Sequence, residues 1–183
     1  EILDKDKRRI EKFETLNYLG YEFKIFNTYL QSTDFRVKRK VEVEISKNKI
    51  KRMKSRLFSS LLSYCSSAKG LGDFKLLEKR LKALTGNYEI NSSGTNVIIK
   101  TGIYFNYHHR TPKNNCRLAD LDRTFQRALF SQGHPLFKKL SASLLLNERR
   151  KLSGFSFLNG YKNVTYYSFT YKELAKIRMH WNK

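Results

Sequence analysis

The chain has 183 residues, of which 37 are lysine or arginine and 16 are aspartate or glutamate, so its formal charge is +21 at neutral pH. Hydrophobic residues make up 40% and aromatic residues 14% of it, which is too much apolar material for a disordered basic tail. We therefore expect one or two folded domains with an anionic partner such as nucleic acid. No run approaches the roughly 18 apolar residues of a membrane span, and we expect no membrane partner.

Two cysteines, Cys65 and Cys116, are too few for a disulfide scaffold and have no metal-ligand spacing. This usage favours a reducing, cytoplasmic location. The adjacent His108 and His109 cannot both point at one ion from a regular strand, so we predict no metal site in this chain. The chain begins with Glu1 followed by a charged stretch, and we expect it to be part of a longer polypeptide.

Residues 1–15 are rich in charge and have few apolar anchors, which predicts a linker or the end of a preceding domain. Apolar and polar residues then alternate over 18–26 and again over 37–45, the period of a strand with one buried face. A polar stretch at 31–34 separates the two segments. Together they predict an antiparallel hairpin over residues 16–45.

A basic amphipathic helix is predicted to follow. Ser46 is a residue type favoured at helix N-caps, and apolar residues then recur at spacings of three and four to about residue 66. Six cations lie in its first turns: Lys47, Lys49, Lys51, Arg52, Lys54 and Arg56. The first, third and fifth of these flank one side of the apolar stripe, and the other three flank the opposite side. No carboxylate on the same turns can neutralise them, which favours phosphate binding over the alternative of a solvated face.

The remaining elements predict a mainly helical region. A second helix begins at Asp73 and ends at Gly86 as a left-handed stop, which gives a helical unit over 46–86. A second hairpin is expected over 88–107, with a turn at 91–96.

Three more helices are predicted from apolar periodicity, over 118–129, over 136–151 and from Thr170 onward, where Glu173 completes a capping box. The fold class is therefore α+β: a small antiparallel hairpin, a basic helical unit, and a C-terminal α+β region over 87–183.

The sequence contains no self-sufficient active site, and we predict no catalytic residue. Gly70 and Gly72 lack the lysine and hydroxyl residue of a phosphate-binding loop. Asp120 and Asp122 point about 200° apart on a helix, so they favour the positive end of that helix rather than a shared metal ion. A basic nuclease would need a carboxylate or histidine cluster, and none is visible.

An aromatic segment near the middle of the chain has two interpretations. Tyr104, Phe105 and Tyr107, which precede Arg110, could stack on unpaired bases or pack in the core. Strand alternation would bury Phe105 and turn Tyr104 the other way. Trp181 is expected to pack in the core.

The segment from Asn17 to Phe23, NYLGYEF, followed by a second strand and the basic helix, resembles the junction of palm and thumb in reverse transcriptases. The resemblance covers residues 16–66. In that family an aromatic or apolar residue, Leu-Gly and an aromatic form the hairpin called the primer grip. The resemblance assigns this role to Leu19, Gly20 and Tyr21 and makes residues 1–15 the end of the palm. Taken alone, a glycine in a strand marks a bulge or a close backbone approach.

Further segments resemble the C-terminal part of bacterial defence-associated, antiviral reverse transcriptases: 84–88, 102–107, 156–161 and 169–181. The resemblance implies that this region holds an RNA template and a DNA primer or product in the bacterial cytoplasm. A noncoding RNA and a second polymerase subunit are further partners it suggests. The family's aromatic-x-Asp-Asp motif is absent from this sequence. The resemblance therefore implies that Mg²⁺ serves the full-length enzyme outside this chain, and that the chain alone is inactive.

The expected function is the thumb and C-terminal part of an RNA-directed DNA polymerase, a nucleotidyltransferase, that clamps the template–primer duplex in antiviral defence. The residues expected to bind nucleic acid are the six cations of the basic helix together with Tyr104 and Arg110. The alternative is a free-standing basic RNA-binding module without polymerase activity.

Overall fold

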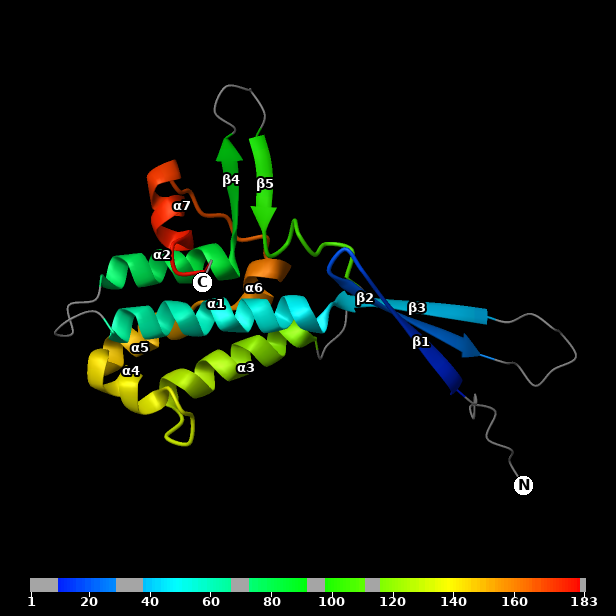
Figure 1. Ribbon diagram of the computed structural model, residues 1–183, viewed down its shortest axis with the longest axis horizontal. Coiled ribbons are helices and arrows are strands. Elements are labelled where there is room, and N and C mark those ends of the chain that lie inside the picture. The colour runs from blue at the N-terminus through cyan, green and yellow to red at the C-terminus, as the bar shows by residue number, and fades with distance from the viewer. Residues whose placement is uncertain (1–9, 29–37, 67–72, 92–97, 111–115, 182–183) are drawn as a thin grey trace, which may run out of the picture.

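The structure is a computed structural model that describes residues 10–28, 38–66, 73–91, 98–110 and 116–181. It is an α+β fold, as predicted from the sequence, in which two antiparallel sheets adjoin a group of helices (Figure 1). The strands are β1 (Ile10–Tyr18), β2 (Tyr21–Thr28), β3 (Lys38–Ile45), β4 (Asn87–Asn91) and β5 (Ile98–Gly102). The helices are α1 (Lys47–Cys65), α2 (Phe74–Thr85), α3 (Arg117–Phe130), α4 (Phe137–Ser143), α5 (Leu146–Ser153), α6 (Phe157–Lys162) and α7 (Tyr171–Arg178).

The first sheet has the order β1-β2-β3 and extends away from the helices (Figure 1). Residues 10–15, expected as a linker or the end of a preceding domain, instead form the first part of β1, which pairs with β2. Their charges hide any alternation, and the strand is defined by its pairing with β2. The hairpin expected over 16–45 is thus part of a three-stranded sheet.

The strand predicted to run through Gly20 is interrupted there. β1 ends at Tyr18 and β2 begins at Tyr21, so Leu19 and Gly20 form a two-residue turn. Their φ angles are 48° and 88°, and positive values at both positions are what a type I′ hairpin turn requires. Gly20 adopts this conformation without the steric cost that a side chain brings.

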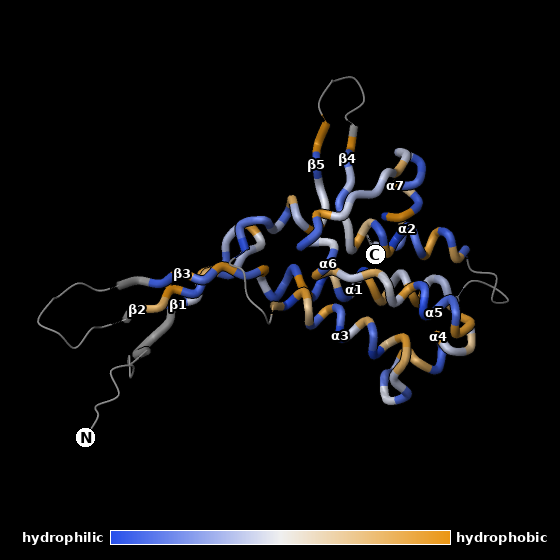
Figure 2. The backbone as a smooth tube through the Cα atoms, turned by 180° about the vertical axis from the view of Figure 1, so that it is seen from behind, coloured by the Kyte–Doolittle hydropathy of each residue, from blue (hydrophilic) through white to orange (hydrophobic). Residues whose placement is uncertain are grey.

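Helix α1 is the centre of the core. It contacts α2, α3 and α4, and Figure 1 shows it lying between α2 and α3. Leu57 and Leu61 of α1 are fully buried against Leu81 of α2 and Phe125 of α3, within one core cluster. Burial of each such side chain contributes about 1.5–3 kcal/mol. Hydrophobic and hydrophilic stretches alternate along the helices, as amphipathic packing requires (Figure 2).

A buried ion pair fixes the first sheet to α3. Strand alternation placed Glu22 on a polar face, but its side chain is buried. Arg117 donates one guanidinium N–H to Glu22 Oε1 and another to the backbone carbonyl of Ile45. The pairing satisfies a carboxylate that would otherwise be costly to bury.

Several predicted helix boundaries are confirmed and others are wrong. Ser46 caps α1 by accepting the N–H of Lys49 at 3.4 Å, and the capping box at the start of α7 is present. The stop at Gly86 is not left-handed: its φ is −119°, and the chain continues directly into β4. The helix predicted over 136–151 is two helices, because the backbone is extended at the buried Leu144. Helix α6 was not predicted.

The second hairpin is present as β4 and β5, but residues 103–105 form turns rather than a strand. The fully buried Asn87 explains the turn. Its side-chain Oδ1 accepts the N–H of Tyr104 at 2.8 Å, and its backbone exchanges hydrogen bonds with Thr165 and Tyr167. One asparagine thus holds together β4, the turn after β5 and the segment that leads to α7.

Among the described ranges, none of the helices combines the length and the apolar character that crossing a membrane would need.

Candidate nucleic-acid interface

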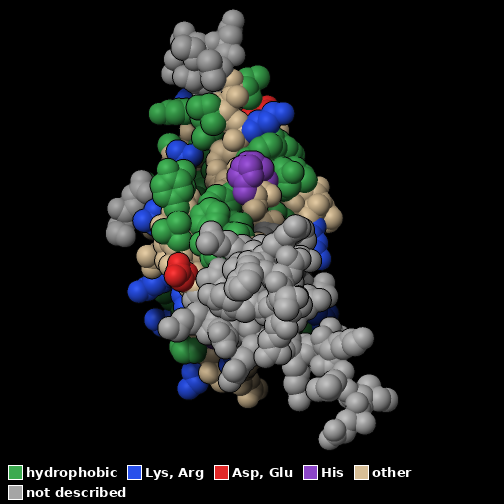
Figure 3. All heavy atoms as spheres, turned by 90° about the vertical axis from the view of Figure 1, so that its right-hand side faces the viewer, with side chains coloured by type: hydrophobic (Ala, Val, Ile, Leu, Met, Phe, Trp, Pro, Cys, Tyr) green, Lys and Arg blue, Asp and Glu red, His purple; other side chains and the backbone are tan. Residues whose placement is uncertain are grey.

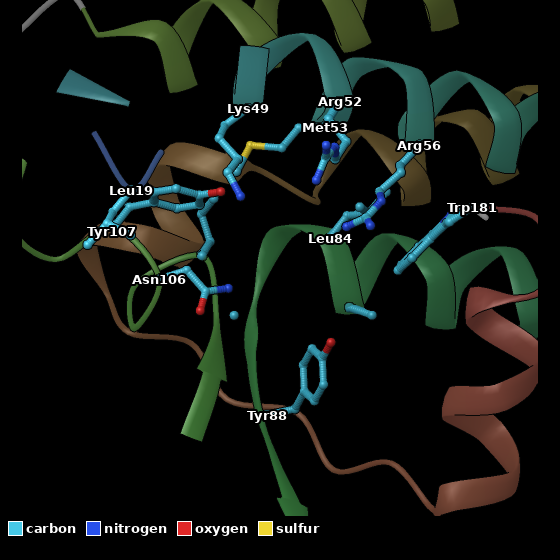
Figure 4. A pocket seen from close by; sticks show the side chains of 13 residues that line it. Leu19, Lys49, Arg52, Met53, Arg56, Leu84, Tyr88, Asn106, Tyr107 and Trp181 are labelled. Atoms are coloured by element: carbon cyan, nitrogen blue, oxygen red, sulfur yellow. The ribbon is translucent and has the colours of Figure 1, made fainter. Parts of the chain in front are cut away.

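A cavity of about 420 Å³ lies between α1, the start of β4, the turn after β5 and the C-terminal Trp181 (Figure 4). Three cations of α1 line it: Lys49, Arg52 and Arg56. They are three and four positions apart, which places them on one face of the helix. No carboxylate belongs to the lining described.

The structure therefore divides the six predicted cations into two groups. Lys47, Lys51 and Lys54 are exposed and do not line the cavity, and Lys54 lies over the ring of Phe58, 5.6 Å from its centroid. No ion pair joins any of the six to a carboxylate within the described part of the chain. Lysine and arginine side chains also outnumber acidic ones on the face seen in Figure 3.

The phenol of Tyr107 lies in the field of these cations. Burial raises the pKa of Tyr107 above its ordinary value, and nearby Tyr21 adds to the rise, whereas Arg56 and Arg52 reduce it. The hydroxyl therefore stays neutral at physiological pH.

The Leu19–Gly20 turn lies beside the basic face of α1. The backbone N–H of Ser46 donates to the carbonyl of Gly20 at 2.9 Å, which joins the turn to the N-cap of the helix. A Cβ on Gly20 would lie 2.8 Å from Cε of Lys49. A smaller cavity of about 240 Å³ adjoins the turn and shares Leu19, Lys49 and Arg52 with the larger one. The predicted hairpin residues and half of the predicted cations thus form one continuous surface.

Tyr21 packs inward and holds the hairpin in place. Its hydroxyl donates to the backbone carbonyl of Asn106 at 3.1 Å, and its ring meets that of Tyr107 edge-on at 6.1 Å. Leu19, in contrast, is 78% exposed. Of the three predicted primer-grip residues, Leu19 and the backbone of Gly20 are therefore the ones that face outward.

Tyr104 and Arg110 do not line this cavity. Tyr104 is half-buried, with its ring 5.6 Å from that of Tyr161. Arg110 is 5% exposed, and its guanidinium lies 4.7 Å from the centroid of the same ring. Of the two interpretations of the aromatic segment, this arrangement corresponds to core packing. Phe105 is half-buried like Tyr104, because the segment is a turn and not the alternating strand predicted.

Sequence reasoning missed three residues that line the cavity: Tyr88, Asn106 and Trp181. Trp181 was expected only to pack. Its indole N–H donates to the hydroxyl of Ser60 at 2.9 Å, and the guanidinium of Arg56 lies 5.4 Å from its ring centroid. No local pattern links these residues to α1, because they are brought together by long-range packing.

The two aspartates of α3 are engaged in structural contacts. Asp120 pairs with Arg123 at 2.5 Å. Asp122 accepts the hydroxyl of Ser156 and the N–H of Phe157, both at 2.7 Å, so it caps α6 rather than its own helix. The described residues hold no group of three or more histidine, cysteine, aspartate or glutamate side chains that could bind a metal ion. They do not fit a Mg²⁺ site, and a site outside this chain stays a prediction.

Comparisons with protein-family models, with curated proteins and with solved structures find no match for this chain.

Proposed function

We propose that this chain clamps a template–primer duplex as the thumb and C-terminal part of a reverse transcriptase of the antiviral defence type. One observation carries the proposal: Lys49, Arg52 and Arg56 converge beside the Leu19–Gly20 turn, in a cavity whose described lining has no carboxylate. Contact with phosphates releases bound counterions, which supplies affinity without reading the base sequence.

The spacing of the three cations suits a nucleic-acid backbone. Lys49 and Arg56 are seven residues apart, so they span about 10 Å along the helix axis. About three successive phosphates of one strand occupy the same length of a duplex. The apolar stripe of α1 is buried in the core, which keeps this row of cations rigid.

The turn would position the primer end. Its exposed Leu19 and the backbone of Gly20 offer an uncharged surface next to Lys49, and the bond from Ser46 fixes the distance between turn and helix. RNA-directed DNA synthesis would then belong to the whole polypeptide, with Mg²⁺ and the aspartates that bind it supplied outside this chain.

A matched pair of variants tests the clamp. Lys49→Gln with Arg52→Gln removes two charges from the cavity, and Lys47→Gln with Lys51→Gln removes two from the opposite flank of the same helix. We expect the first pair to lower the slope of log affinity for an RNA–DNA hybrid against log salt by about 1.8, at about 0.9 per phosphate contact. The second pair should lower it by less than half as much. Equal effects, or losses that depend on base sequence, would contradict the proposal.

Two further outcomes separate the alternatives. Tight binding of single-stranded RNA with no binding of the hybrid duplex would favour the basic RNA-binding module without polymerase function. The chain alone should incorporate no nucleotide in the presence of Mg²⁺, and incorporation would overturn the assignment of catalysis to another part of the polypeptide.

A further inference from the structure

The cavity has two chemically different walls. Lys49, Arg52 and Arg56 point into it from α1, whereas Tyr88 and Asn106 point into it from the opposite side (Figure 4). Between them the floor is apolar, formed by Met53, Leu84 and Ile103. The first wall suits a phosphate, which needs only cations and N–H donors.

The opposite wall suits a nucleobase. The Asn106 side chain is exposed and carries both donors and an acceptor, the groups that base edges require. Its amide meets within the described chain only the hydroxyl of Thr101, at 3.4 Å. The Tyr88 ring and the apolar floor offer the flat face of a base a surface that no charged group interrupts.

The size of the cavity selects a single nucleotide. Its volume of about 420 Å³ lies near the lower end of the range of about 300–1,000 Å³ for sites that enclose one small ligand. One base with its sugar and phosphate fits this volume, whereas a base pair flanked by two backbones does not.

Arg56 is prepared for an anion at this position. Its Nε is buried and has no hydrogen-bond partner among the described residues, while its guanidinium is held over Trp181. A buried donor without a partner is costly, and an anionic ligand that reaches the guanidinium recovers part of that cost. Trp181 is itself fixed by the bond to Ser60, so the group is positioned before a ligand arrives.

We infer that this cavity binds one unpaired nucleotide of a nucleic-acid strand, with the phosphate on the α1 cations and the base against Tyr88, Asn106 and the apolar floor. The inference rests on the proposed function, since it names the part of the strand that the basic face of α1 receives. It makes the surface selective for a junction between duplex and single strand over a uniform duplex.

Trp181 is the one tryptophan of the chain and reports on the site through its contact with Arg56. The full chain would be titrated with a blunt duplex, with the same duplex carrying a one-nucleotide overhang, and with that overhang made abasic. Anisotropy of the labelled duplex gives the affinity, and tryptophan fluorescence gives occupancy of the cavity. We expect the overhang with a base to bind about tenfold more tightly than the abasic one and to change the fluorescence, because base stacking supplies affinity of this order.

The controls separate this inference from the clamp itself. Failure of every duplex to bind would overturn the proposed function. Binding of all duplexes with equal affinity for the two overhangs would leave the clamp standing and overturn the nucleotide site. Inorganic phosphate that reproduces the fluorescence change would reduce the site to an anion site, and a free mononucleotide that binds as tightly as the overhang would assign it to a free nucleotide. Either result would overturn the inference.

Two variants test the base-binding wall. Asn106→Leu should reduce the ratio between the two overhang affinities from about tenfold to near one, whereas Asn159→Leu, at an exposed position outside the cavity, should keep it. Tyr88→Phe removes only a hydroxyl and keeps the packed ring, so it offers a variant whose folding is not in question. An unchanged ratio in both Asn106→Leu and Tyr88→Phe would contradict the inference.

Discussion

The hydroxyl of Tyr21 donates to the backbone carbonyl of Asn106 at 3.1 Å and so joins the first hairpin to the far wall of the cavity. We expect Tyr21→Phe to lower the free energy of unfolding by about 1 kcal/mol, because it removes one hydrogen bond and keeps the ring. Chemical denaturation measures this directly. Tyr171→Phe, at an exposed position on α7, is the control and should leave the stability unchanged. A similar loss in both variants would mean that the Tyr21 bond does not contribute.

The turn between β1 and β2 predicts opposite effects at its two residues. Gly20→Ala should destabilise the fold by about 1 kcal/mol, because a side chain disfavours the positive φ and would also displace Lys49. Leu19→Asn should stabilise it, since asparagine tolerates positive φ. Gly133→Ala, where no atom lies within 4 Å of the added carbon, serves as the neutral reference. Thermal melts of the three variants rank them, and a stabilising Gly20→Ala would refute this description of the turn.

Asp122 and Asp120 form a matched pair on α3. Asp122→Ala should cost about 1–2 kcal/mol, because it removes the acceptor for the first N–H groups of α6. Asp120→Ala should cost much less, because its ion pair with Arg123 is exposed. Urea denaturation measures both. Equal losses would show that the cap of α6 is not what Asp122 provides.

Acid should release α7 from α2. Lys79 donates to Glu173 at 2.5 Å, and this bond, with those from Thr170, lowers the pKa of Glu173 to about 2. Since the pKa is lower in the folded than in the unfolded chain, the stability it brings is present above about pH 4.5 and is lost as the pH falls toward 2. Trp181, which follows α7, should change its fluorescence in this window. Glu173→Gln should show the altered signal at neutral pH and no such acid transition, and an unaltered acid transition in that variant would refute the assignment.

The sequence predicted the elements whose cause is local. The spacing of Ile50, Met53 and Leu57 is enough to define α1, and Thr170 with Glu173 is enough to begin α7. The sequence also placed Lys49, Arg52 and Arg56 on one flank of the helix, because helical geometry alone determines that grouping.

What the sequence did not reveal depends on partners far along the chain. Nothing near Glu22 indicates that Arg117 makes its burial tolerable, and nothing near Tyr104 indicates that Asn87 bends residues 103–105 into a turn. For the same reason the second wall of the cavity was missed. Its residues come from β4, from the turn after β5 and from the end of the chain.

Arg56 belongs at once to the wall that faces the ligand and to the contact that holds Trp181. Coupling between two sites is reciprocal, so a ligand that favours one position of this guanidinium must shift the docking equilibrium of the last turn, and docking must shift ligand affinity by the same factor. The end of the polypeptide is thereby a thermodynamic sensor of whether the cavity is filled.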